Sequence, residues 1–216
     1  SGIVMLNGAS NTVSVDGTVS TNGVLSDMGP GSVSASAMGA VNYGAINLGL
    51  QGNGTILLTG NDGTAAGAIT LSGTLATANT TSTAITVRGT TALMLPNVTT
   101  TGGAQTYNDA VTLKNDMVVT GSTVSFLDAV TGGSKSLTIT GNAVLGNGGV
   151  GDTVTGVTTL IVSGTSSVGA SLIDTSSSQT YTGAITLTRD TELKGVGLKL
   201  DGAVDGAKAP VLLRGR

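Results

Sequence analysis

The sequence predicts an all-β fold, a parallel β-helix or β-solenoid, on the strength of three observations. Alternating segments of three to five residues are separated by Gly, Asn-Gly or Asp-Gly turns along the chain. No apolar pattern with a 3.6-residue period persists, and the poor helix formers Gly, Thr, Ser, Asn and Val dominate. A segment that begins at position 105 recurs from position 179 onward. Such repeated short strands bury their apolar residues only by stacking turn on turn.

The internal repeat aligns residues 105–113 (QTYNDAVTL) with residues 179–187 (QTYTGAITL), and its register continues downstream. It defines eight structural positions: Gln105, Tyr107, Leu113, Asp116, Gln179, Tyr181, Leu187 and Asp190. We expect each Gln to hydrogen-bond neighbouring backbone at a turn. We expect each Tyr to cap the apolar interior or to stack along the fibre.

A shorter period divides this long repeat. Strand centres at Thr112, Thr138, Ile161 and Thr186 are nearly evenly spaced, which predicts turns of about 25 residues. The 216 residues would then form a single solenoid of roughly nine turns, with divergent turns over 1–94 and the repeat within 95–216. The alternative is a pair of β-sandwich modules, but these need longer strands and a large aromatic core residue. The chain has one Phe and no Trp.

Composition excludes several kinds of chemistry. The chain has no His and no Cys, so Ser-His-Asp or Cys-His catalysis, His or Cys metal sites and disulfides are excluded. We expect no enzyme activity and no catalytic, cofactor-binding or metal site. A charged fraction of 10% and a net charge of −3 argue against nucleic acid as a partner. Residues 1–87 hold three Asp and no Lys or Arg, and the remainder is balanced.

The length of the apolar runs and the first residues of the sequence indicate whether the chain has a membrane-spanning segment or a secretion signal. No apolar run approaches the roughly 18–20 residues that span a bilayer, so we expect no membrane insertion. The segment that begins at Ser1 has no initiator Met and no charged stretch typical of a secretion signal. We therefore expect a piece excised or processed from a longer chain.

Residues 148–154 (GGVGDTV) come close to the Gly-Gly-x-Gly-x-Asp repeat with which secreted β-rolls bind Ca²⁺. The Asp stands one residue early and the pattern occurs once, which favours an ordinary Gly-rich turn. Residues 61–63 (NDG) are likewise typical of a turn and lack the further oxygen ligands of an EF-hand.

Two surface patterns suggest other functions. Residues 189–194 (RDTELK) are the densest charged stretch, and paired carboxylates could cleave polysaccharide. A solvated strand face explains them more simply. Thr-x-Thr pairs begin at residues 81, 138, 153 and 186, as in ice-binding solenoids. Their uneven steps do not predict one stripe.

The QTY segments, each followed by an Asp and a Gly-flanked apolar strand, resemble the QTYxGAVTL repeat of filamentous haemagglutinin-type exoproteins, which are exported by two-partner secretion. The resemblance covers about residues 95–216. It implies a right-handed parallel β-helix at the surface of a Gram-negative bacterium or outside it, with roles in adhesion or biofilm cohesion. In that family such repeats form a shaft.

The first hypothesis is therefore a non-catalytic, structural and adhesive shaft segment. Its partners would be host or bacterial surface glycans or proteins, or copies of itself. The second is a self-assembling subunit of an extracellular filament or sheath, because an uncapped solenoid can stack head to tail. The third is a carbohydrate-binding or carbohydrate-active β-helix.

Overall fold

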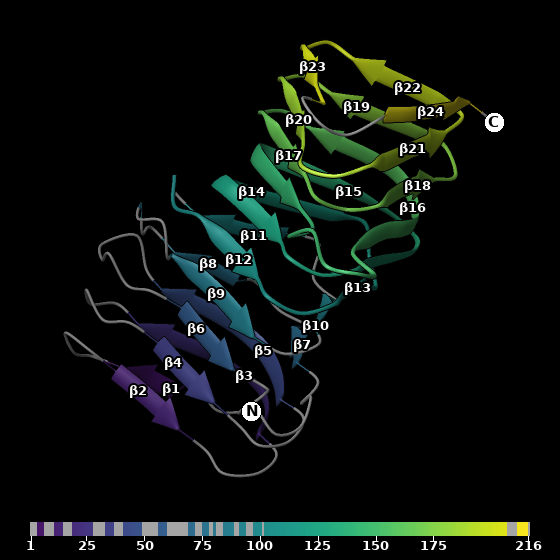
Figure 1. Cartoon of the computed structure of the whole chain (residues 1–216). Helices are drawn as coiled ribbons and strands as arrows, with labels where there is room; N and C mark the ends of the chain where they lie inside the picture. The colour runs from purple at the N-terminus through teal and green to yellow at the C-terminus, as the bar shows by residue number, and fades with distance from the viewer. Residues whose placement is uncertain are drawn as a thin grey trace.

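The computed structural model is a β-solenoid (Figure 1). It describes residues 102–206 without a gap, the segments 84–88, 91–93, 97–100 and 211–215, residue 80, and before residue 80 only the strands. The strands are β1 (Val4–Leu6), β2 (Asn11–Ser14), β3 (Val19–Asp27), β4 (Val33–Ser36), β5 (Val41–Leu48), β6 (Ile56–Thr59), β7 (Ile69–Leu71), β8 (Leu75–Thr77), β9 (Ile85–Arg88), β10 (Thr91–Leu93), β11 (Asn97–Thr100), β12 (Gln105–Tyr107), β13 (Val111–Leu113), β14 (Met117–Phe126), β15 (Val130–Leu145), β16 (Thr153–Val162), β17 (Ser166–Val168), β18 (Leu172–Thr175), β19 (Ser178–Tyr181), β20 (Ile185–Leu187), β21 (Thr191–Gly195), β22 (Gly197–Leu200), β23 (Val204–Asp205) and β24 (Val211–Gly215). No helix occurs among these described residues.

The strands form three parallel ladders, which the chain visits in the same order in each turn. Ladder 1 contains β2, β4, β6, β9, β12, the ends of β14 and β15, β17, β20 and β23. Ladder 2 contains the starts of β3 and β5, β7, β10, β13, the starts of β15 and β16, β18, β21 and β24. Ladder 3 contains β1, the ends of β3 and β5, β8, β11, the start of β14, the middle of β15, the end of β16, β19 and β22.

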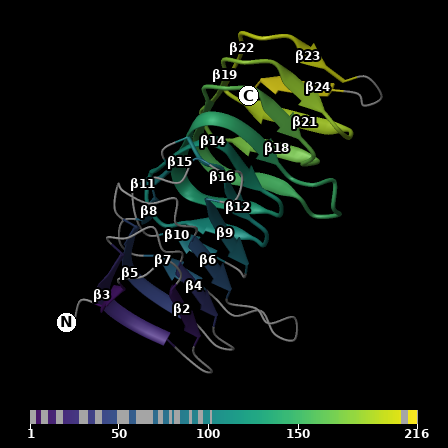
Figure 2. The ribbon, with the colours of Figure 1, turned by 90° about the vertical axis from the view of Figure 1, so that its left-hand side faces the viewer.

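These ladders confirm the predicted parallel solenoid. Figures 1 and 2 show the strands stacked along one axis, with the N-terminus at one end of the rod and the C-terminus at the other. The β-sandwich alternative is wrong, because all pairings between the described strands are parallel and join one sheet. The right-handed sense and the division at residue 95 stay predictions.

The turn size and the turn count differ from the prediction. Gln105 pairs with Val124, which in the next turn pairs with Ala143, so these two turns are clearly shorter than expected. From β9 onward, where the description is nearly continuous, the chain makes about 6 turns, which differs from the expected nine. The error in turn size has a structural cause: Thr112 lies on ladder 2, Thr138 on ladder 3 and Thr186 on ladder 1. The spacings between these strand centres were therefore measured from one ladder to another, and they do not equal the length of a turn.

The long repeat does not span a whole number of turns either. Three turns along ladder 1 lead from Gln105 to Ser166. Gln179 follows two corners later, on ladder 3. The second copy of the repeated segment is consequently rotated about the axis by one face relative to the first.

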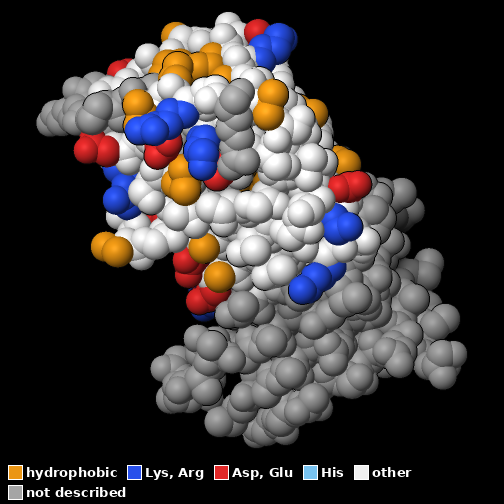
Figure 3. Space-filling model, turned by 90° about the vertical axis from the view of Figure 1, so that its right-hand side faces the viewer, with side chains coloured by type: hydrophobic (Ala, Val, Ile, Leu, Met, Phe, Trp, Pro, Cys, Tyr) orange, Lys and Arg blue, Asp and Glu red, His pale blue; other side chains and the backbone are white. Residues whose placement is uncertain are grey.

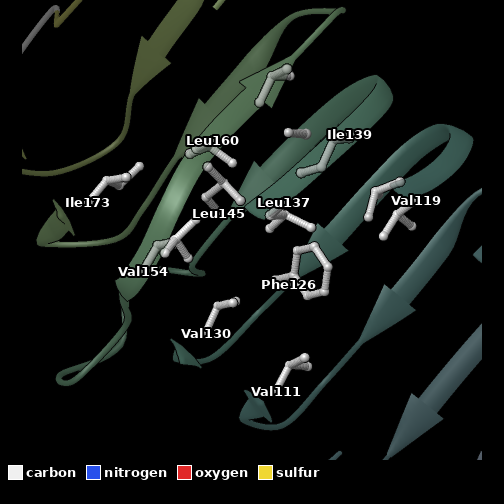
Figure 4. Packing of buried hydrophobic residues seen from close by; sticks show 14 of the residues in the cluster. Val111, Val119, Phe126, Val130, Leu137, Ile139, Leu145, Val154, Leu160 and Ile173 are labelled. Atoms are coloured by element: carbon white, nitrogen blue, oxygen red, sulfur yellow. The ribbon is translucent and has the colours of Figure 1, made fainter. Parts of the chain in front are cut away.

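A continuous apolar column lies inside each ladder. On ladder 3, Val98, Val119, Ile139, Val162 and Tyr181 follow one another in register, and each is 0% exposed. Figure 4 shows how such side chains from all three faces meet in a narrow interior. Burial of a side chain of this size contributes about 1.5–3 kcal/mol, so stacking holds the turns together.

Glycines form a second column, at the corner between ladders 3 and 1. They are Gly141, Gly164, Gly183 and Gly202, and the amide of each of the middle two donates to the carbonyl of the glycine one turn earlier, at 2.9 and 3.2 Å. A Cβ on Gly164 would lie 2.6 Å from the carbonyl carbon of Gly141, and one on Gly183 would lie 2.5 Å from the Gly164 oxygen. A side chain therefore does not fit at this corner, because the backbones of successive turns are in contact there.

Candidate functional site

The first QTY segment forms a buried hydrogen-bonded unit at the start of β12. The Nε2 atom of Gln105 donates to the carbonyl of Val98 at 3.4 Å and to the carbonyl of Thr120 at 2.9 Å. The hydroxyl of Tyr107 donates to Gln105 Oε1 at 3.1 Å. Both side chains are 0% exposed. Val98 precedes Gln105 in the chain and Thr120 lies one turn further on, so the amide joins two successive turns at a corner.

The second QTY segment repeats this geometry in β19. Gln179 Nε2 donates to the carbonyls of Ile173 at 2.9 Å and Lys194 at 2.8 Å, and the Tyr181 hydroxyl donates to Gln179 Oε1 at 3.0 Å. Both side chains are again 0% exposed. We call each Gln with its Tyr a Gln-Tyr clamp, one formed by residues 105 and 107 and the other by residues 179 and 181. Because the repeat is rotated, the first clamp lies at the corner between ladders 3 and 1 and the second at the corner between ladders 2 and 3.

Burial changes the acidity of the two tyrosines. Removing the hydroxyl from water disfavours its charged form and raises the pKa of both Tyr107 and Tyr181 far above the ordinary value. The ring of Tyr107 also stacks on Phe126 in the next turn, with centroids 4.9 Å apart. Both hydroxyls therefore stay neutral donors and hold their Gln side chains in place.

The other predicted repeat positions divide into core and surface. Leu113 is 1% exposed and Leu187 is 5% exposed, and both belong to the apolar interior. Asp116 is exposed, and its Oδ1 accepts a hydrogen bond at 2.8 Å from the amide of Ser136, which lies at the same corner one turn further on. Asp190 is exposed just before β21. The eight positions thus lie along the solenoid and do not converge on one pocket.

The Gly-rich loop 146–152 is held by its own groups. Asp152 is 4% exposed, and its Oδ2 accepts hydrogen bonds from the amides of Asn147 at 2.8 Å and Gly149 at 2.9 Å. Arg189, two turns on, donates from Nη1 to the carbonyl of Gly149 at 2.8 Å. The one carboxylate of the calcium-like pattern is therefore engaged with backbone donors. No sequence pattern indicated the Arg189 contact, because it joins residues 40 positions apart.

The charged stretch 189–194 contributes to ion pairs between turns. Lys194 Nζ lies 3.0 Å from Asp174 Oδ2 on the adjacent strand, and Arg214 Nε lies 3.1 Å from Glu192 Oε1. The first pair follows the ladder 2 register, in which Asp174 lies beside Lys194. The second is diagonal, because Arg214 lies beside Lys194 and Glu192 lies beside Leu212. The contacts are those of a solvated strand face.

The Thr-x-Thr pairs do not share a face. The pair at 138 and 140 lies on ladder 3, the pair at 153 and 155 at the start of β16 on ladder 2, and the pair at 186 and 188 at ladder 1. Thr81, with residues 61–63, lies outside the described residues. The described pairs therefore form no single stripe.

Acidic side chains do not gather into a metal centre in the part of the chain that the structure describes. No group of three or more His, Cys, Asp or Glu side chains there could hold a metal ion. Nor does that part contain a helix long and apolar enough to cross a membrane.

The three ladders, the glycine column and the clamps together define a β-solenoid repeat protein. No family model, no curated protein and no solved structure matches the chain at a significant level.

Proposed function

We propose that the chain is a rigid, non-catalytic shaft segment of a large secreted bacterial surface protein that acts in adhesion or biofilm cohesion. One observation carries the proposal. The buried amides of Gln105 and Gln179 bond backbone carbonyls of two successive turns, so the conspicuous repeated residues serve cohesion along the axis. A shaft needs this cohesion, whereas a catalytic or ligand site needs such groups free to meet a substrate.

The location and the partners belong to the same proposal. The resemblance of the QTY segments to haemagglutinin-type repeats supports a place at or outside the surface of a Gram-negative bacterium. The expected partners are surface glycans or proteins of the host or of other bacteria. The exposed strand faces of ladders 1 and 3 offer hydroxyl groups for such contacts, among them those of Thr140 on ladder 3 and Thr186 on ladder 1.

The mechanical part of the proposal is tested by force spectroscopy on the chain held between two handles. We expect the solenoid to resist until its turns are pulled off in sequence, each releasing the length of one turn, with a higher force where a clamp must break. Chains with Gln179→Leu should lose the force peak of the second clamp and keep that of the first. A chain that extends smoothly at low force cannot serve as a shaft.

The adhesive part is tested separately with coated beads. Beads carrying the chain should attach to bacterial biofilm or to host-cell surfaces more strongly than beads carrying an unrelated solenoid of similar length. Equal attachment of the two kinds of bead contradicts an adhesive role while leaving the shaft role standing. A reducing-sugar assay on soluble polysaccharides addresses the carbohydrate-active alternative, and any enzymatic release of sugar contradicts the non-catalytic proposal.

A further inference from the structure

The Gly-rich loop 146–152 contains an Asn followed by a Gly, at positions 147 and 148, and such a pair can modify itself. The backbone nitrogen of the Gly loses its proton to water or hydroxide and attacks the side-chain carbonyl carbon of the Asn. Ammonia leaves, and a five-membered succinimide ring forms. Water then opens the ring at either carbonyl, so that aspartate or isoaspartate remains. Glycine favours the ring closure because it has no Cβ to collide with the Asn side chain.

The fold leaves the attacking nitrogen free. The amides on either side of it, those of Asn147 and Gly149, donate to Asp152 Oδ2 at 2.8 and 2.9 Å. The amide of Gly148 lies between them and donates to no group among the described residues. Gly148 is exposed, and a Cβ on it would meet nothing within 4 Å. Attack by this nitrogen therefore breaks no hydrogen bond of the described structure.

The side chain of Asn147 is held beside this nitrogen. Its Oδ1 accepts a hydrogen bond from the amide of Gly149 at 3.0 Å, which keeps the carboxamide next to the Gly148 backbone. During the attack negative charge develops on Oδ1, and a fixed backbone N–H stabilises such a charge. The Nδ2 atom, which leaves as ammonia, donates to no group in the described part of the chain, and the residue is exposed to water. The loop thus brings the reacting groups together.

Asn142, on strand β15, has the opposite arrangement. It is also exposed, and its Oδ1 accepts hydrogen bonds from the amide and the Oγ1 of Thr165, each at 3.0 Å. The next residue is Ala143, whose amide donates to the carbonyl of Thr165 at 2.8 Å. The nitrogen that would have to attack is therefore engaged with the next turn, and its residue carries a Cβ. Exposure is the same for the two asparagines, and the free amide distinguishes Asn147.

Conversion would change the charge at the loop. It adds one carboxylate to a chain whose net charge is −3. The amide of Gly149 donates both to Asn147 Oδ1 and to Asp152 Oδ2, so the new carboxylate would meet the existing one at a single donor. Like charges at this distance repel each other. Most of the described surface in Figure 3 belongs to neither charged nor hydrophobic side chains, so one added charge is a considerable local change.

Isoaspartate would also change the backbone of the loop. It inserts one carbon into the main chain between residues 147 and 148. The contacts that hold the loop are made to this stretch: Asp152 accepts from the amides on both sides, and Arg189 Nη1 donates to the carbonyls of Gly148 at 3.4 Å and Gly149 at 2.8 Å. A longer main chain cannot keep all of these contacts in place.

We propose that Asn147 is a modification site, at which attack by the Gly148 nitrogen converts the side chain to aspartate or isoaspartate in the folded protein, and that conversion releases loop 146–152 from Asp152 and Arg189. The proposal goes beyond the proposed function, because a shaft segment needs no such change. It rests on the geometry of the loop alone.

The modification is tested by incubating the full chain at about 37 °C and about pH 8 and following its peptides by mass spectrometry. Each conversion raises the mass by about 1 Da, and fragmentation of the peptide locates it. The same chain unfolded in guanidinium chloride is the reference. We expect Asn147 of the folded chain to convert at a rate within about tenfold of the unfolded rate, or faster, while Asn142 keeps its mass. A folded rate lower by more than that factor, or equal conversion of Asn142, overturns the proposal.

The release of the loop is tested by thermal denaturation before and after the incubation, with Asn147→Gln as the control. Gln keeps the amide but would have to close a larger ring, so it should not react. This variant also retains the other Asn-Gly pairs, which begin at residues 7, 22 and 53. We expect the midpoint of the wild type to fall as conversion proceeds and that of Asn147→Gln to stay constant. If the converted wild type keeps its midpoint, or both proteins lose stability alike, the release of the loop is overturned.

Discussion

Gln179 accepts a hydrogen bond on Oε1 from the hydroxyl of Tyr181 at 3.0 Å, and neither side chain reaches solvent. The Tyr fixes the orientation of the amide, so its two hydrogens point to the carbonyls of Ile173 in the same turn and Lys194 in the next. The same relationship holds between Gln105 and Tyr107. A polar group is tolerated in this narrow apolar interior because every one of its hydrogen-bonding atoms has a partner.

Substitution of Gln179 by Leu is expected to destabilise the protein by about 2–4 kcal/mol, because Leu keeps similar bulk but leaves two buried carbonyls without this donor and the Tyr181 hydroxyl without its acceptor. Chemical denaturation followed by circular dichroism measures the loss. Thr180→Ala, on the outward side of the same strand, is the control and should change stability by less than about 0.5 kcal/mol. Equal losses for the two variants would mean that the clamp contributes nothing of its own.

Substitution of Gly164 by Ala is expected to cost about 1–3 kcal/mol, because a Cβ would lie 2.6 Å from backbone atoms of Gly141 that the ladder holds in place. Gly197→Ala is the matched control. Its Cβ would meet only the Cβ of Ser178, at the ordinary contact distance of 3.7 Å. Thermal denaturation of both variants measures the difference. A Gly164→Ala protein as stable as Gly197→Ala would show that the corner can move apart freely.

The fold class follows from local sequence signals, because short alternating segments with turn residues leave few alternatives to a stacked coil. The turn length does not follow from them. Each turn contains three similar strands, so a period measured between strands can join different faces, as it did for Thr112, Thr138 and Thr186. The turn length can be read from the spacing between successive glycines of the column, which are Gly141, Gly164, Gly183 and Gly202. The reason is that the backbones of successive turns touch at that corner.

The clamps could be predicted in part. The repeat of Gln and Tyr two residues apart identified Gln105 and Gln179 as positions that hydrogen-bond neighbouring backbone at a turn. The carbonyls that these Gln side chains bond depend on how the next turn stacks. Gln105 bonds the carbonyl of Thr120 and Gln179 that of Lys194, each 15 residues further along the chain. The contact between Arg189 and the loop at Gly149 crosses two turns and has no local pattern.

Stability is expected to fall as the pH rises above about 10. The pKa of Tyr107 and that of Tyr181 are raised by burial in the folded state, whereas in the unfolded chain they return to about 10. The stabilising contribution is therefore complete below pH 10. Above it, unfolding releases two protons and is favoured by about 2.7 kcal/mol for each pH unit.

Denaturation midpoints measured between about pH 8 and pH 11.5 test this dependence. The double substitution Tyr107→Phe and Tyr181→Phe should remove most of the slope, although it lowers stability at neutral pH by leaving each Gln Oε1 without its donor. The absorbance of tyrosinate gives an independent reading. If both tyrosines ionise near pH 10 in the folded chain, the clamps are open to solvent and the structural argument fails.

Asp152 is expected to stabilise its loop as a backbone acceptor and not as a calcium ligand. Its Oδ2 accepts hydrogen bonds from two amides, those of Asn147 and Gly149, and Arg189 holds the same loop from two turns away. Asp152→Ala should therefore cost about 1–3 kcal/mol, since the Asn147 amide loses this acceptor and the Gly149 amide keeps only Asn147 Oδ1, at 3.0 Å. Asp190→Ala, at an exposed carboxylate, should cost less than about 0.5 kcal/mol. Neither calcium nor a chelator should move the thermal midpoint of the wild type. A midpoint that rises with calcium, and does so only while Asp152 is present, would instead mean that the ion displaces the amides and that the loop is a metal site.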